Sequence, residues 1–157
     1  MDTGQLFHNN LASEIEGAVT FYSNAGFQSS PDAVPVNLNP TEQGQLANFL
    51  RVLNAAENIR QVRKRVQFIR DHRTAGNTQL IVVSLTDVQD ALNDLHVVTF
   101  NKDLNPTAQS HLAAAQSVLT AAQTTNDNQR PALMDQVLSR LTSAENDLFT
   151  SNPDHLF

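Results

Sequence analysis

Apolar residues recur at helical spacing through most of this 157-residue chain. The longest such stretch begins where Asn39 can accept hydrogen bonds from the first helical turn and Pro40 has the φ that suits its first position. Glu42 completes a capping-box pattern with Asn39. The spacing of three and four predicts one helix to about Arg73, with a single buried apolar stripe formed by Leu46, Phe49, Leu50, Leu53, Ala56, Ile59, Val62, Val66 and Ile69.

Three more helices are predicted after this one, joined by short polar turns such as the turn around Gly76. The β-branched run Leu80–Leu85 would also suit a buried strand, but its apolar spacing continues for four turns, which favours a helix. Asn105 and Pro106 repeat the helix-start signal of Asn39 and Pro40. The three helices are expected from about Thr78 to Val97, from Pro106 to just before Thr124, and from about Pro131 to Phe149.

A shorter helix is predicted before the long one. Ser13 and Glu16 form a second capping-box pattern, and Gly26 is a plausible point for the chain to leave helical geometry. The segment Gln28–Val36 contains two prolines and no helical period, so it is predicted to be a loop. The expected fold is all-α: a short N-terminal helix and loop followed by an up-and-down bundle of about four helices, in a single domain of residues 1–157.

Composition narrows the function classes. With 40% hydrophobic and 17% charged residues the chain is expected to fold, and its net charge of -6 argues against binding to nucleic acid. No apolar run approaches the roughly 20 residues of a membrane span, and the N-terminus lacks the pattern of a signal peptide. The chain has no cysteine, which excludes disulfides, thiolate nucleophiles, cysteine-ligated metals and covalent c-type haem.

Candidate metal and catalytic residues are few. The five histidines show no spacing that would place two ligands on one helix face. Asp87, Asp90 and Asp94 share a helical stripe, which we interpret as a solvated face because no partner ligands accompany them. Nothing resembles a hydrolase triad or a phosphate-binding glycine loop. The residues alone therefore predict neither a metal site nor a catalytic site.

A basic run follows the central apolar stretch and has two interpretations. Its members could form an interaction surface for an acidic partner: Arg60, Arg63, Lys64 and Arg65. Alternatively, an antiparallel hairpin around Gly76 would bring Arg60 and Arg63 level with Asp87 and Asp90. Opposite charges would then face each other and favour one helix register.

Two segments carry a family resemblance. Gly4–Asn10, with the Phe-His-Asn element, leads into Ile15–Tyr22, and Leu38–Asn54 contains Leu-Asn-Pro-Thr-Glu followed by Leu-Ala-Asn-Phe-Leu-Arg-Val-Leu-Asn. Together they resemble the C-terminal part of bacterial di-haem cytochrome c peroxidases and of their relatives that mature tryptophan-derived cofactors. The resemblance covers residues 1–60, and residues 61–157 form a helical extension.

The resemblance implies a haem-proximal role for three residues. Tyr22 falls where the family places an axial ligand of its second haem, and His8 and Asn9 would lie in the loop that lines this haem. The haem-attachment motifs of the family are absent here, so haem would have to come from another domain or chain. The other interpretation of Tyr22 is a packed tyrosine at the edge of the core.

Three functions follow as expectations. The first is a non-catalytic helical domain that completes a haem domain or mediates assembly, with a haem-bearing domain or chain of the same system as its partner. The second is an electron-transfer or peroxidase component that uses haem supplied by another chain. The third is an independent helical interaction module with an exposed apolar patch. The family is periplasmic, and helical faces could also join copies of the chain into a homo-oligomer.

Overall fold

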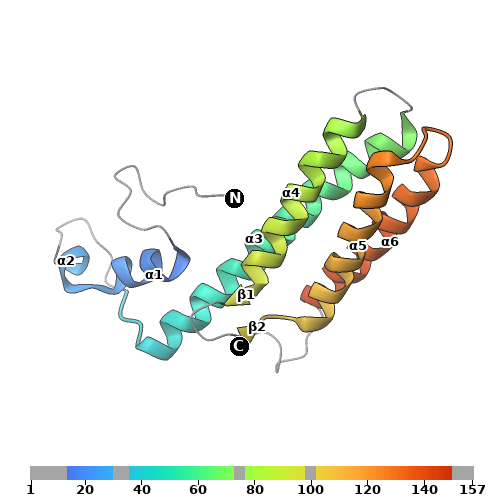
Figure 1. The fold of residues 1–157 in the computed structure, drawn as a ribbon. Coiled ribbons are helices and arrows are strands. Elements are labelled where there is room, and N and C mark those ends of the chain that lie inside the picture. The colour runs from blue at the N-terminus through green and yellow to red at the C-terminus, as the bar shows by residue number, and fades with distance from the viewer. Residues whose placement is uncertain (1–13, 30–35, 73–76, 98–101, 150–157) are drawn as a thin grey trace. The chain divides into compact units, whose positions relative to one another are not determined.

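The computed structural model describes residues 14–29, 36–72, 77–97 and 102–149. These residues are almost entirely helical, with one pair of two-residue strands (Figure 1). In chain order the elements are α1 (Ile15–Ser23), α2 (Ala25–Gln28), α3 (Pro40–Asp71), α4 (Asn77–Leu95), β1 (His96–Val97), β2 (Lys102–Asp103), α5 (Pro106–Thr124) and α6 (Arg130–Phe149). The predicted all-α class is confirmed.

Backbone contacts divide the chain into two compact units, and the boundary falls after Arg51, inside α3. The first unit contains α1, α2 and the first turns of α3. The second contains the rest of α3 together with α4, α5 and α6. Each unit is described by itself below.

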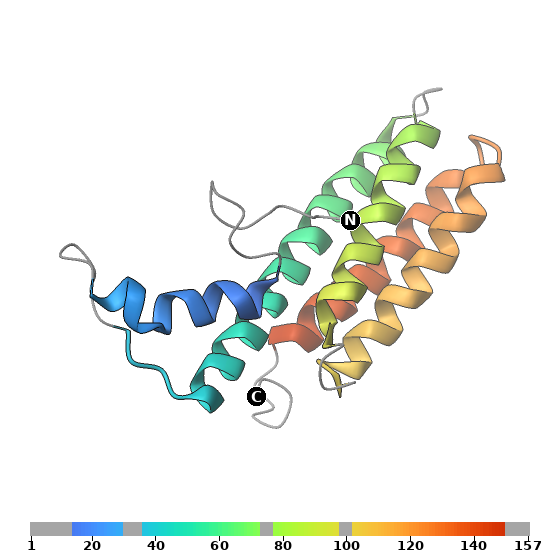
Figure 2. The same cartoon turned by 60° about the vertical axis from the view of Figure 1, so that its left-hand side comes forward.

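The second unit is a four-helix bundle in which consecutive helices alternate in direction (Figure 2). Short connections between successive helices make this up-and-down arrangement the expected one. Side-chain contacts link α3 to α4, α4 to α5, and α6 back to α3, namely Arg65 with Asp87, Gln89 with Gln116, and Arg63 with Glu145. Helices α5 and α6 also pack on each other, with His111 beside Asp147, so the four helices close into a ring around one core.

Aliphatic side chains from all four helices fill the core of the bundle. They are almost completely removed from solvent, with exposures of 0–3%, and include Ile59, Val62 and Val66 of α3, Ile81 and Val88 of α4, Leu112 and Leu119 of α5, and Met134, Leu141 and Leu148 of α6. Burying a side chain of this size contributes about 1.5–3 kcal/mol, so this core is the main source of the bundle's stability. The stripe predicted along the long helix includes Ile59, Val62 and Val66 of this core.

At the ends of α3, α4 and α5, a polar side chain from the start of the next helix donates hydrogen bonds to carbonyl groups of the chain where the preceding helix ends. The last carbonyls of a helix have no partner within the helix, so these bonds satisfy groups that would otherwise be left unpaired. Asn77 donates to the carbonyls of Ile69 and His72, Gln109 to those of Leu95 (3.2 Å) and Leu104 (3.1 Å), and Arg130 to those of Ala122 (3.2 Å) and Thr125 (2.7 Å).

The two Asn-Pro helix starts behave differently. Asn39 and Glu42 form the predicted capping box. The backbone N–H of Asn39 donates to the Glu42 carboxylate at 2.8 Å, and the backbone N–H of Glu42 donates to Asn39 Oδ1 at 3.0 Å. Asn105 instead adopts a left-handed conformation, with φ 52°, and its side chain makes no capping bond. The predicted helix start at Asn105 and Pro106 is confirmed, since α5 begins at Pro106, but Asn105 does not cap this helix through its side chain.

The N-terminal unit departs from prediction at its helix boundaries. Helix α1 ends at Ser23, before Gly26, and Gly26 lies inside α2. Asn24 makes the break, because its side chain accepts from the Phe27 amide at 2.8 Å and starts α2. Ser13 lies outside the described residues, and the N-cap residue of α1 is Glu14.

The apolar stripe predicted along α3 is divided between two faces. Val52, Ala55, Ile59, Val62, Val66 and Ile69 are buried in the bundle as a continuous row. The earlier members are exposed instead: Leu46 36%, Phe49 46%, Leu50 37% and Leu53 42%. At about 100° per residue, the two sets lie on roughly opposite sides of the helix. The expectation of one buried stripe is wrong because both sets satisfy a three-and-four spacing while pointing in different directions.

Candidate functional site

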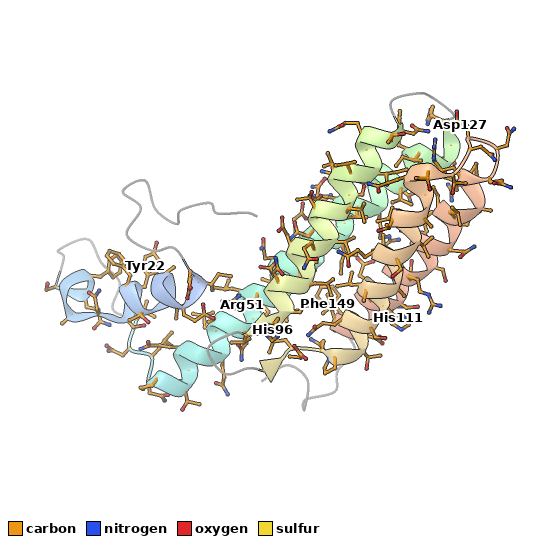
Figure 3. All side chains as sticks on the ribbon, in the orientation of Figure 1. Tyr22, Arg51, His96, His111, Asp127 and Phe149 are labelled. Carbon is orange, nitrogen blue, oxygen red and sulfur yellow. The ribbon has the colours of Figure 1, made fainter. Side chains whose placement is uncertain are left out.

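Tyr22, the candidate axial ligand, belongs to a cluster of three aromatic rings on α1 and α2. The Tyr22 ring centroid lies 5.7 Å from Phe21 and 4.9 Å from Phe27, and both pairs have edge-to-face geometry. Phe21 and Phe27 are 5.6 Å apart. Edge-to-face packing is the favourable arrangement for such rings. We call these three residues the aromatic cluster; Tyr22 is its most solvent-accessible member, with 43% exposure (Figure 3).

The break at Asn24 brings Phe27 back beside the end of α1 and so assembles the aromatic cluster. Polar side-chain contacts attach helix α1 to α3 within the first unit, among them the hydrogen bond from Thr20 to Gln43 and the ion pair between Arg51 and Glu16. Val19 and Ala47 are the buried apolar residues of this unit's described part. Arg51 donates two hydrogen bonds to the Glu16 carboxylate, at 2.8 and 2.7 Å.

The charge on Glu16 is stabilised by this pairing. Partial burial acts to raise the pKa of Glu16, but the hydrogen bonds from Arg51 and its positive charge outweigh burial and leave the pKa below its ordinary value. The carboxylate is therefore ionised near neutral pH, and α1 is held by a charged contact.

The residues present fit a haem only in part. His8 and Asn9 lie outside the described residues. From residue 14 to residue 51 the sequence contains no histidine, methionine or cysteine, so Tyr22 is the one axial donor of the usual kinds there. This segment could add one ligand to a haem that is held elsewhere, but it supplies neither covalent attachment nor a histidine ligand.

The predicted basic surface is largely neutralised by acidic partners. Arg60 bonds to Glu57 in the same helix, at 2.6 and 2.5 Å. The hydrogen bonds from Arg60 and Gln61 lower the pKa of Glu57 to about 2. Lys64 is exposed on the same face of α3. On this face Arg60 and Glu57 balance each other's charge, and Lys64 adds one positive charge.

The sequence predicts that Arg60 and Arg63 face Asp87 and Asp90 across the α3–α4 hairpin, and the observed ion pairs join other partners. Asp87 pairs with Arg65, and Arg63 pairs with Glu145 of α6. Arg63 and Arg65 are separated by about 200° around the helix, so they face different neighbours. Counting residues from the turn predicted how far along the two helices the contact lies. It could not predict which arginine side chain of α3 faces α4.

The aspartate stripe of α4 faces α3, where a solvated face had been predicted. Asp87 meets Arg65, and Asp94 Oδ2 accepts hydrogen bonds from Asn54 at 2.8 Å and Asn58 at 3.3 Å. Asparagine and arginine donors complement the carboxylates without any metal. No group of three or more metal-type ligands occurs within the described parts of the chain.

The described histidines have separate local roles. His72 stacks on Phe68, with ring centroids 4.3 Å apart, at the end of α3. His96 Nδ1 lies 2.8 Å from Asp103 Oδ1 across the β1–β2 pair. Hydrogen bonds from His96 and Gln109 lower the pKa of Asp103. His111 of α5 lies at the same end of the bundle as His96 (Figure 3). No pattern in the sequence points to the His96 contact, because it depends on the strand pair.

Comparison with protein-family models, with curated proteins and with solved structures gives no match. None of the described helices is both long enough and apolar enough to cross a membrane. The structure therefore defines the class as an all-α protein, in which a four-helix bundle continues from a smaller helical unit.

Proposed function

We propose that the chain is a non-catalytic helical component whose first unit completes a haem-bearing domain supplied by another domain or chain. The bundle would be the scaffold that carries this unit and mediates assembly. The proposal joins the resemblance of residues 1–60 to the di-haem peroxidase family with the way in which apolar residues are distributed between the two units.

The observation that carries the proposal is the small core of the first unit. Every member of the main hydrophobic cluster lies between Val52 and Leu148. Among the described residues 14–51, Val19 and Ala47 are the buried apolar residues, whereas large side chains such as Tyr22 and Phe49 are exposed. With only these two buried apolar residues, the described part of the first unit gains little free energy from its own packing. A binding partner would supply the missing surface.

Tyr22 is the residue we assign to the haem-facing side. A haem carried by the partner would supply the redox chemistry, while the tyrosine phenol could donate to the iron or to a group beside it. Phe21 and Phe27 would orient its ring through the edge-to-face contacts. In this role the aromatic cluster positions one oxygen atom and covers apolar surface.

Hydrogen exchange on the intact chain tests the proposal. A haem-bearing chain encoded beside this one is co-expressed with it, and amide exchange is measured with and without that partner. We expect slower exchange in Ile15–Ser23 on binding and little change in α5. Tyr22→Ser should weaken the complex, whereas Phe149→Ser, which alters an aromatic residue of the second unit with 56% exposure, should not. Unchanged exchange in α1 with a bound partner would refute the assignment of the first unit.

A second candidate is a haem-dependent electron-transfer component, and the exposure of Tyr22 favours it. This function requires a Soret band when ferric haem is added to the chain, saturating at one haem per chain. Tyr22→Phe removes the oxygen donor and keeps the ring, so it should shift that band. A chain that stays colourless on titration with ferric haem is not such a component.

A further inference from the structure

We propose that the haem-bearing partner holds the first turns of α3 in an apolar groove edged by lysine or arginine side chains. The contact would be made by three apolar residues and one acidic residue, which we call the α3 docking face: Glu42, Leu46, Phe49 and Leu50. All four belong to the first unit. This inference rests on the proposed function and deepens it, because it assigns the contact between the proteins to α3 and leaves the aromatic cluster to face the haem.

The α3 docking face lies along one side of the helix. At about 100° per residue, its four members fall within an arc of about 100°. Leu46, Phe49 and Leu50 expose 36%, 46% and 37% of their surface, and Glu42 is also exposed. Apolar side chains three and four residues apart are the anchors by which a helix inserts into a groove of another protein. The exposed face therefore has the pattern of a helix that is held in a groove.

Contacts within the first unit use a different side of α3. Gln43 and Arg51 bind Thr20 and Glu16 of α1. Both of these α3 residues lie outside the arc of the docking face. Helix α1 is therefore attached to α3 in a way that leaves the docking face accessible to another protein.

Charge indicates what kind of surface the partner presents. Residues 1–51 contain five acidic residues and one basic residue, so they carry a formal charge of -4 out of -6 for the whole chain. The one basic residue, Arg51, is paired with Glu16. The exposed carboxylates of Glu14 and Glu42 keep the surface of this unit acidic. A partner that presents lysine or arginine side chains around its apolar groove is complementary to this surface.

The same charge argues against two other occupants of the docking face. A second copy of the chain would bring two units of charge -4 together and so would be repelled. The headgroups of anionic lipids would be repelled in the same way, because such membranes attract basic segments. A basic protein surface is therefore the occupant that the charge favours.

Glu42 can bind a basic group without breaking the cap of α3. Its Oε2 accepts the backbone N–H of Asn39 at 2.8 Å, so Oε1 can accept a hydrogen bond from a lysine or arginine of the partner. Glu42 precedes Leu46 by about one turn. The basic group would therefore lie at the rim of the groove, where the apolar contact ends.

The affinity of the intact chain for the purified haem-bearing chain tests the apolar part of the contact. Phe49→Ser should weaken binding about tenfold or more, since buried aromatic anchors contribute much of the free energy of an interface. Because Phe49 is exposed, this change should leave the thermal unfolding of the free chain unaltered. Phe68→Ser is the matched control, since Phe68 is 45% exposed on the same helix but belongs to the second unit, and it should bind like the wild type. Equal affinity of Phe49→Ser and the wild type would overturn the proposal.

The dependence of the affinity on salt tests the basic rim. Binding of the wild type should weaken as sodium chloride is raised from about 50 mM to about 500 mM, because salt screens the attraction. Glu42→Gln keeps a capping-box residue and removes the charge, so it should bind about threefold more weakly at low salt and respond less to added salt. Asp135→Asn removes an exposed acid of the second unit and should behave like the wild type. An identical salt response of Glu42→Gln and the wild type would refute the basic rim.

The variants also separate this inference from the proposed function. If Tyr22→Ser weakens the complex and Phe49→Ser does not, the partner binds the aromatic cluster alone, which refutes the α3 docking face and retains the proposed function. If the wild type does not bind the haem-bearing chain, both are refuted. A dimer of the chain alone that Phe49→Ser abolishes would assign the face to a second copy. Binding to phosphatidylglycerol vesicles that Phe49→Ser abolishes would assign it to a membrane, and either result would overturn the proposal.

Discussion

The guanidinium of Arg51 on α3 donates two hydrogen bonds, at 2.8 and 2.7 Å, to the carboxylate of Glu16 on α1. With 16% and 30% side-chain exposure, this pair is better shielded than most surface ion pairs. It is also bidentate, and its geometry is that of the stronger charge-assisted bonds. This contact is the main polar attachment of α1 within the first unit.

Arg51→Met should therefore loosen α1 while the bundle keeps its stability. The expected loss is about 1 kcal/mol, above the value of a fully exposed ion pair because the contact is bidentate and partly buried. Hydrogen exchange should show faster exchange of the amides of Ile15–Ser23 and no change in α5. Arg140→Met, at an exposed arginine of α6, is the control and should leave both regions unchanged. Equal acceleration throughout the chain would mean that Arg51 supports the bundle instead.

Acid should release α1 through Glu16. The pKa of Glu16 is lower in the folded unit than its ordinary value of 4.5, so its ionised form contributes stability above that value. That contribution is lost as the pH falls below about 4.5 toward the folded pKa. Amide exchange corrected for intrinsic pH effects should show progressively weaker protection of α1 as the pH is lowered through and below 4.5.

Glu16→Gln should remove most of this acid dependence, since glutamine does not titrate. Glu14→Gln serves as the matched control, because Glu14 is exposed and lies two residues before Glu16. The control should keep the acid response of the wild type. If both variants respond like the wild type, another group controls the attachment of α1.

Arg130 is a second site where one side chain should have a measurable effect. It is 7% exposed and donates to the carbonyls of Ala122 at 3.2 Å and Thr125 at 2.7 Å, as well as to the Asp127 carboxylate. Arg130→Met leaves these acceptors without their donor and should cost about 1–3 kcal/mol in the free energy of unfolding. Urea unfolding measures this cost, and Arg140→Met on the same helix should cost less than about 0.5 kcal/mol.

Equal effects of the two arginine substitutions would show that water replaces Arg130 at the end of α5. The expected difference depends on burial, because the unpaired carbonyls of a buried helix end are costly whereas exposed ones are solvated. The turn after α5 therefore tests whether the capping side chains add stability beyond that of the core.

The bundle was predictable because its signals are local and repeated. Helix starts at Pro40 and Pro106 and the long apolar periods of α3 to α6 each depend on residues close together in sequence. The faces of α3 were not predictable to the same degree, since Leu50 and Val62 fit the same spacing although one is exposed and the other buried. Which face is covered depends on tertiary packing.

The candidate site was less predictable than the fold. The family resemblance points to Tyr22, but no sequence pattern points to the contacts that hold its ring, because the break at Asn24 is what returns Phe27 to it. Pairs such as Arg63 with Glu145 join residues far apart in the chain. Sequence spacing around a single turn contains no information about the third and fourth helices.

The left-handed conformation of Asn105 leads to a prediction about backbone strain. Its φ of 52° places a side chain in a region that favours glycine, and its buried Nδ2 has no hydrogen-bond partner. Asn105→Gly should therefore match or exceed the wild type in stability, whereas Asn105→Ala should be about 1–2 kcal/mol less stable than the glycine variant. Chemical unfolding of the three proteins should rank the glycine variant as the most stable, or equal to the wild type, and the alanine variant as the least stable. If alanine were as stable as glycine, the chain before Pro106 would have to relax out of the left-handed conformation, and the turn between β2 and α5 would be adaptable.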